Sequence, residues 1–125
     1  MINKFIGEVD ASEFGAGFTI RLDMAGQAEL ETQFGEFEFI GKVQLGLAVL
    51  SAKYMRAFLA VSLRDADGKI VKVVEMPDVP LEPIGKKCLD ALALFRYGKD
   101  HETWAKEAQA AKPATSENPT KGMKA

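Results

Sequence analysis

Cysteine, histidine and tryptophan each occur only once in this chain of 125 residues, as Cys88, His101 and Trp104. A single cysteine excludes a disulfide within the chain and is consistent with a reducing compartment. No apolar run approaches the roughly 18 residues that suggest a transmembrane helix. The N-terminal stretch MINKFIGEVD also lacks the apolar core of a signal peptide. We therefore expect a cytoplasmic protein.

A strong net charge is also absent. The 16 Lys and Arg residues nearly balance the 18 Asp and Glu residues, which leaves a net charge of −2. This balance argues against a general nucleic-acid binder or a protein that binds anionic membranes. Hydrophobic residues make up 47% of the chain and charged residues 27%. That composition supports one modest domain with a core of its own.

Motifs that carry chemistry are equally scarce. The stretch from Asp65 to Gly68 resembles the start of a calcium loop, but the twelfth position holds Met76 instead of the required Glu. We interpret that stretch as a turn built on Asp-Gly. Cys88 lies within an apolar helical stripe, where a thiol is usually a small buried hydrophobe. The sequence predicts no catalytic residue, no cofactor and no metal site.

The N-terminal quarter predicts a β-hairpin that runs into a helix. Residues 4–9 and 17–23 have the features of two short strands, and the second alternates Phe18, Ile20 and Leu22 with polar residues. Asp23 is in place to cap the following helix, and Gly35 is in place to end it. Gly26, in the first turn of that helix, is expected to weaken it by about 1 kcal/mol relative to alanine.

The segment 36–50 has two apolar sides at helical spacing. One side contains Phe39, Ile40, Val43, Leu47 and Leu50. The other contains Phe37, Leu45 and Val49. Two apolar sides on a short helix have two interpretations: the helix is buried at the centre of the fold, or one side binds a partner protein.

The remaining elements follow from caps, prolines and glycines. We predict helices over 52–64 (capped by Ser51), 82–97 (ended by Gly98) and 101–111, and a strand over 69–76 that either extends the hairpin or connects helices. Residues 112–125 are rich in Pro, Ser, Thr and Lys and predict a flexible tail. The fold class is therefore α+β, mainly α, with an N-terminal β-hairpin packed on three to four short helices. The predicted division is a compact domain over 1–98, a helical extension over 99–111 and the tail.

A family resemblance rests on residues in the first half of the chain. The order F-x-G-E-V, a turn, T-I-R-L-D, A-G-Q-A-E-L-E and F-G resembles the tail assembly chaperones of gene transfer agents and siphophage-like particles. The matching positions are Phe5, Gly7 to Val9, Thr19 to Asp23, Ala28 to Glu31, Phe34-Gly35 and the Ser-capped segment Ser51 to Leu63. The resemblance covers roughly residues 1–64, and the helix at 82–97 fits the family's closing helix by type.

The resemblance implies a role without catalysis. Such proteins are thought to coat the long helical tape measure protein and keep it soluble while tail tube subunits are recruited. The expected partners are thus the tape measure protein and the tail tube protein, with self-association possible and with no nucleic acid or membrane. We predict a partner-binding surface made of Phe37, Leu45 and Val49, with Leu59 and Leu94 on neighbouring helices.

Two alternatives from other classes remain open. One is a structural subunit of the tail tube or connector, which would assemble into rings or tubes. The other is a small enzyme that uses Cys88 or His101 with carboxylates such as Asp23 and Glu29.

Overall fold

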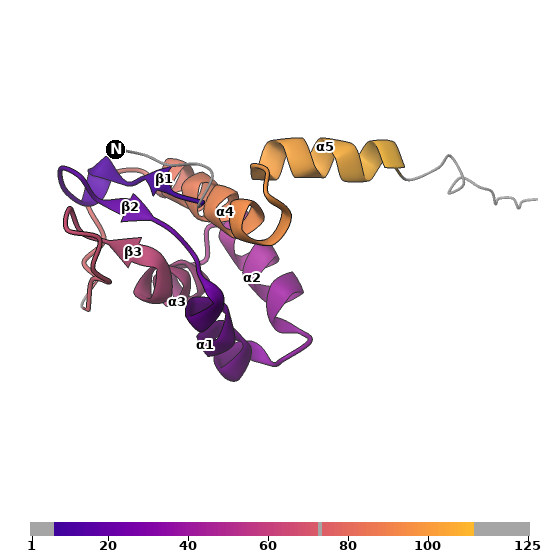
Figure 1. The fold of residues 1–125 in the computed structure, drawn as a ribbon, viewed down its shortest axis with the longest axis horizontal. Coiled ribbons are helices and arrows are strands. Elements are labelled where there is room, and N and C mark those ends of the chain that lie inside the picture. Colours follow the sequence, from indigo (N-terminus) through magenta and orange to yellow (C-terminus); the bar gives the residue numbers. More distant parts are fainter. Residues whose placement is uncertain (1–6, 73, 112–125) are drawn as a thin grey trace, which may run out of the picture.

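The computed structural model describes residues 7–72 and 74–111, and it is mainly helical with a small antiparallel sheet near the N-terminus (Figure 1). The helices are α1 (Met24–Phe34), α2 (Phe39–Ala48), α3 (Ala52–Ser62), α4 (Leu81–Tyr97) and α5 (His101–Ala111), with a 3-10 helix, η2 (Ser12–Phe14), in the hairpin loop. The strands are β1 (Val9–Asp10), β2 (Thr19–Ile20) and β3 (Leu63–Arg64). The predicted α+β, mainly α class is confirmed. The tail predicted over 112–125 lies outside the described residues.

The sheet contains the predicted hairpin, with strands that are shorter than expected over the described residues, and positions 4–6 of the first predicted strand lie outside those residues. β1 and β2 pair in antiparallel fashion, with Val9 opposite Ile20. The loop between them is closed by the Ala11 N–H, which donates to the Phe18 carbonyl at 2.9 Å. β3 pairs with the other edge of β2, where Leu63 lies opposite Ile20. The order β1-β2-β3 therefore places β2 in the centre.

The prediction of a strand over 69–76 was wrong for the residues that the structure describes, 69–72 and 74–76, and the third strand comes from the residues directly after α3. Of the predicted segment, Ile70 forms only an isolated bridge to Arg64. The Val71 N–H donates to the Leu63 carbonyl at 2.9 Å. β2 has a partner on both edges, so the segment 69–76 meets the outer edge of β3, and its described residues form this bridge and hydrogen bond there without a longer ladder.

The N-terminus of α1 is held by the cap that the sequence predicts. The Asp23 carboxylate accepts a hydrogen bond from the Gly26 N–H at 2.8 Å and a second, from the Arg64 guanidinium, at 2.9 Å. Burial raises the pKa of Asp23, but these two hydrogen bonds, together with the positive charges of Arg64 and Arg21, outweigh it and leave the pKa below its usual value. The cap thus joins α1 to β3 as well as satisfying the helix end.

Replacing Asp23 by alanine is expected to lower the free energy of unfolding by about 1 to 2 kcal/mol at pH 7, mostly through the lost cap because solvent screens the partly exposed ion pair. Since the folded-state pKa is depressed, the stabilisation is present above the unfolded-state pKa and is lost as the pH falls through the folded-state value. Urea denaturation from pH 7 to about pH 2 measures this difference. The control is Asp67→Ala, whose exposed side chain has no hydrogen bond or ion pair within the described part. An equal pH dependence in both variants would contradict the prediction.

Gly26 has a packing role that the sequence does not show. A Cβ at this position would lie 2.9 Å from the Val61 carbonyl oxygen of α3 and 3.0 Å from Leu22 Cδ1. Gly26 is accordingly buried in the structure. The glycine therefore permits a close contact between α1 and α3, and this contact offsets its poor helix propensity.

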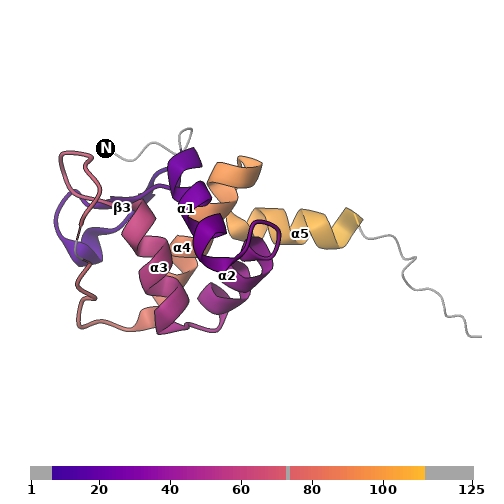
Figure 2. The same ribbon diagram turned by 90° about the horizontal axis from the view of Figure 1, so that it is seen from below.

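The core lies between α1, α2, α3 and α4. In the view of Figure 2, α1, α2 and α3 lie together with α4 behind them, and α4 also contacts β1 and β2. α4 contributes a full buried stripe to this core: Ile84, Gly85, Cys88, Leu89, Ala91, Leu92 and Ala93. The stripe confirms the amphipathic helix predicted over 82–97. The observed helix begins one residue before the predicted start, at Leu81. Gly98 ends it in the left-handed conformation that the sequence predicts.

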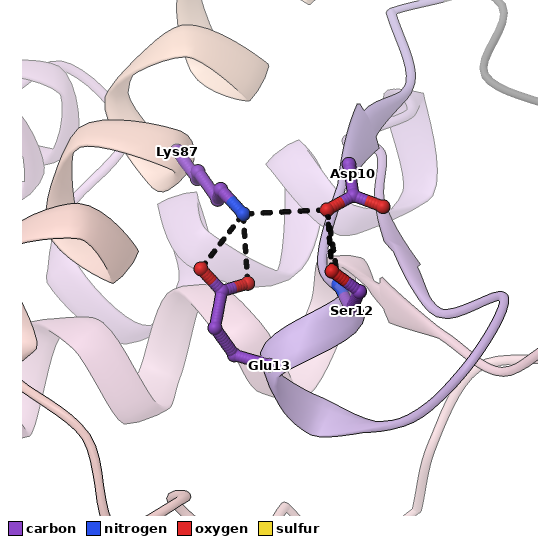
Figure 3. A network of polar contacts seen from close by, with 4 residues as sticks. All are labelled: Asp10, Ser12, Glu13 and Lys87. Carbon is purple, nitrogen blue, oxygen red and sulfur yellow. Dashed lines mark hydrogen bonds and ion pairs between the residues drawn. The ribbon is translucent and has the colours of Figure 1, made fainter.

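A polar network fastens the hairpin to α4 (Figure 3). Lys87 Nζ donates to both carboxylate oxygens of Glu13, at 2.7 and 2.8 Å, and to Asp10 at 3.4 Å. The Ser12 hydroxyl donates to the same Asp10 carboxylate at 2.8 Å. Hydrogen bonds from Ser12 and then from Lys87 lower the pKa of Asp10. A two-stranded hairpin is marginal alone, and this network together with the core supplies its support.

The predicted helix at 101–111 is present as α5, and it packs on α4. The rings of Tyr97 and Trp104 stack with their centroids 4.8 Å apart and their planes at 6°. The His101 N–H donates to the Asp90 carboxylate of α4 at 3.1 Å. In Figure 1, α5 projects from the end of α4 away from the sheet.

Candidate functional site

Three large apolar side chains are exposed on and beside α2. Phe37 is 83% exposed, Leu45 65% and Val49 64%. Phe37 lies in the turn before α2, whereas Leu45 and Val49 lie one turn apart at the other end. We refer to these three residues as the α2 surface. They are the three residues of the segment 36–50 that the sequence assigns to a partner-binding side.

The opposite side of α2 explains why this surface faces outward. Phe39, Val43, Gly46 and Leu47 are buried against the rest of the fold. These positions follow the three- and four-residue spacing of one helix face, so α2 can bury only that face. α2 therefore divides its apolar residues into one core row and one exposed row.

The turn between α2 and α3 fixes the end of the α2 surface. Among the described residues, Leu50 is the one non-glycine residue with a positive φ, which is 61°. This conformation costs a leucine about 1 kcal/mol or more. A Cβ built on Gly85 of α4 would lie 2.7 Å from Leu50 Cδ2, so the leucine packs directly onto the helix backbone at that glycine. The turn thus holds Val49 outward while Leu50 points toward α4.

Two of the predicted surface residues lie elsewhere. Leu59 is fully buried, together with Met55, Phe58 and Ser62 of α3. Leu59 belongs to the core because α3 has α1, α2 and α4 around it. Leu94 is half-buried on α4, and its Cβ lies 3.7 Å from where a Cβ of Gly7 would be. The structure therefore does not bring Leu59 and Leu94 into the α2 surface.

Charged residues surround the start of the α2 surface. Glu36 and Glu38 flank Phe37, and both are exposed. Lys42 is also exposed, and its Nζ donates to the Phe34 carbonyl at 3.4 Å. The apolar side chain of Phe37 is therefore bordered by carboxylates, which keep the region hydrated in the absence of a partner.

The structure places the residues considered for catalysis in the core, at a helix end and on helix surfaces. The Cys88 thiol is fully buried in the core, and burial raises its pKa, which disfavours the reactive thiolate. His101 is half-buried on α5, with its ring 5.8 Å from that of Trp104. Asp23 caps α1, and Glu29 is exposed and accepts a hydrogen bond from Gln33 at 3.3 Å. Within the described residues, no group of three or more His, Cys, Asp or Glu side chains could hold a metal ion.

A second surface feature, not predicted from the sequence, is an open groove where α2, α4 and α5 meet. Its volume is about 570 Å³. Leu47, Leu50 and Leu89 contribute apolar side chains to it, and α4 and α5 each contribute a Glu and a Lys. The sequence shows the spacing of these charges, but only the tertiary arrangement of α5 brings them to one groove.

None of the helices within 7–72 and 74–111 is long and apolar enough to cross a membrane by itself, and only α2 and α3 taken together, across a bend of 112°, reach that length and composition. No protein-family model, curated protein or solved structure matches the chain.

Proposed function

We propose that the protein is a non-enzymatic tail assembly chaperone that binds an apolar helical segment of the tape measure protein on its α2 surface. The observation that carries this proposal is the exposure of Phe37, Leu45 and Val49, which the fold leaves uncovered although it buries the other side of the same helix. The resemblance of residues 1–64 to tail assembly chaperones supplies the identity of the partner. We further propose the tail tube protein as a second partner and the cytoplasm as the place of assembly.

The α2 surface suits a chaperone because its contacts are limited in area. Covering the exposed parts of three such side chains gains about 3 to 6 kcal/mol before the entropy lost on association is subtracted. A single contact of this size is weak and reversible. A long amphipathic helix offers many equivalent positions, so many copies can cover it and still be released when tube subunits arrive.

Replacing Phe37 and Leu45 together by alanine is expected to weaken binding to the tape measure protein at least about tenfold, because each change removes exposed apolar area and little of the core. Co-expression with a tape measure protein, followed by size-exclusion chromatography with light scattering, measures co-elution and stoichiometry. We expect many copies per tape measure chain with the wild type and few with the double variant.

The matched control is Met24→Glu, which changes an exposed apolar side chain on α1 outside the α2 surface. This variant is expected to bind as the wild type does. Loss of folding in the Phe37/Leu45 variant would show that these residues belong to the core and would contradict the proposal. A protein that ignores the tape measure but assembles into rings or tubes would instead support a structural subunit of the tail tube or connector.

A further inference from the structure

We propose that the groove between α4 and α5 is a self-association surface that receives α5 of a second copy of this chain. The groove is open, has a volume of about 570 Å³ and is lined by none of the three residues of the α2 surface. Its apolar part is formed by Leu47, Leu50 and Leu89. A helix can lie there only if its charges match those of the two groove walls.

The walls carry the same pair of charges at the same spacing. On α5, Glu102 and Lys106 face the groove, 65% and 76% exposed, with 3.3 Å between their charged atoms. On α4, Glu82 and Lys86 line the groove, and neither has an ion pair within the described residues. When two helices each carry an acidic and a basic residue four positions apart and lie antiparallel, the acidic residue of each helix faces the basic residue of the other.

A twofold axis brings that pattern onto itself. In a symmetric dimer the same patch is used by both copies, and an axis perpendicular to α5 makes the two α5 helices antiparallel. Ala105, the smallest side chain that α5 contributes to the groove, is the natural point of closest approach. With the axis beside Ala105, Glu102 of each copy lies about 3 Å along the helix axis from Lys106 of the other, because each residue advances the helix by 1.5 Å.

The α5 helix is built to make such a contact. It is held to α4 by the Tyr97–Trp104 stack and the bond from the His101 N–H to Asp90, so its groove-facing side is fixed before association. A preorganised helix loses little conformational freedom when a second copy docks. The second copy also brings its own α5 against the Glu82 and Lys86 wall.

Charge reversal tests this arrangement by sedimentation equilibrium of the full chain over a range of concentrations. The wild type is expected to dimerise. Glu102→Lys alone, or Lys106→Glu alone, is expected to weaken dimerisation about tenfold, because each interface contains two cross-copy contacts and both become repulsive. The double variant Glu102→Lys/Lys106→Glu restores both contacts between the α5 helices but no longer matches the Glu82 and Lys86 wall, so it is expected to dimerise more tightly than either single variant.

The decisive sample is an equimolar mixture of the two single variants, which is expected to form a heterodimer more tightly than either variant dimerises alone. Each variant keeps its own altered α5 in the mixture, so recovery cannot come from repaired folding. Circular dichroism of each variant confirms that the helices are intact. A monomeric wild type, unchanged dimerisation of the single variants, or no recovery in the mixture would each overturn the proposal. The tape measure protein is absent from this assay, so the result is independent of the proposed chaperone function.

Discussion

Replacing Gly46 by alanine is expected to lower the free energy of unfolding by about 2 to 3 kcal/mol. A Cβ at this position would lie 2.4 Å from Tyr54 Cγ and 2.6 Å from Tyr54 Cβ. The Tyr54 Cβ is attached to the backbone of α3, so the clash cannot be relieved by rotating the side chain alone. The two helices must separate, and the loss of packing outweighs the gain of about 1 kcal/mol in helix propensity.

Gly41 provides the control because it lies in the same helix with nothing within 4 Å of its potential Cβ. Gly41→Ala is expected to raise the free energy of unfolding by up to about 1 kcal/mol, since only helix propensity changes. Urea denaturation measures both variants in one experiment. The same chemical change in one helix therefore gives opposite signs, and destabilisation by both substitutions would show that propensity and packing are wrongly assigned.

The features that the sequence predicted correctly are those decided within one or two turns of the chain. Asp23 and Ser51 accept hydrogen bonds from N–H groups three residues later, and Gly98 ends α4 in a left-handed conformation. Donor, acceptor and conformation all lie in a short segment, so residue type and position are enough to identify them. Local rules of this kind located each of the helices α1 to α5 to within a few residues.

The third strand required information that is not local. Residues 69–76 have a high β propensity, yet the edge of β2 is taken by Leu63 and Arg64. Strand formation depends on the availability of a partner edge as much as on the side chains. The end of α3 places Leu63 directly at that edge, and Ile70 of the later segment forms an isolated bridge to Arg64 instead. The periodicity of the sequence does not show which segment pairs with the edge of β2.

The sequence predicted the exposed apolar residues of the α2 surface but not the groove. Phe37, Leu45 and Val49 are separable from the core row by their helical angle alone, and the structure exposes all three. The groove depends on how α5 folds back on α4 through Trp104 and Asp90, which are contacts between different helices. Helical angle is also insufficient for a helix that other helices surround. It identifies one buried side of the helix but not how many residues that side contains.

Leu59 shows that limit, and its replacement by alanine is the strongest test of the corrected assignment. The side chain is fully buried in the core cluster, beside Phe58 and Met55 in α3. Leu59→Ala is expected to lower the free energy of unfolding by about 2 to 5 kcal/mol, through lost burial and the cavity that remains. Leu45→Ala is the matched control, because the same atoms are removed from an exposed side chain, and its expected effect is within about 0.5 kcal/mol.

The two leucine variants also separate stability from partner binding. Once the folded fraction measured by urea denaturation is taken into account, Leu59→Ala should bind the tape measure protein as the wild type does, because a buried residue touches no partner. Leu45→Ala should keep its stability and lose affinity, because its side chain faces solvent until a partner covers it. Equal stability losses in the two variants would place Leu45 in the core. A binding loss confined to Leu59→Ala would move the partner-binding surface from α2 to α3.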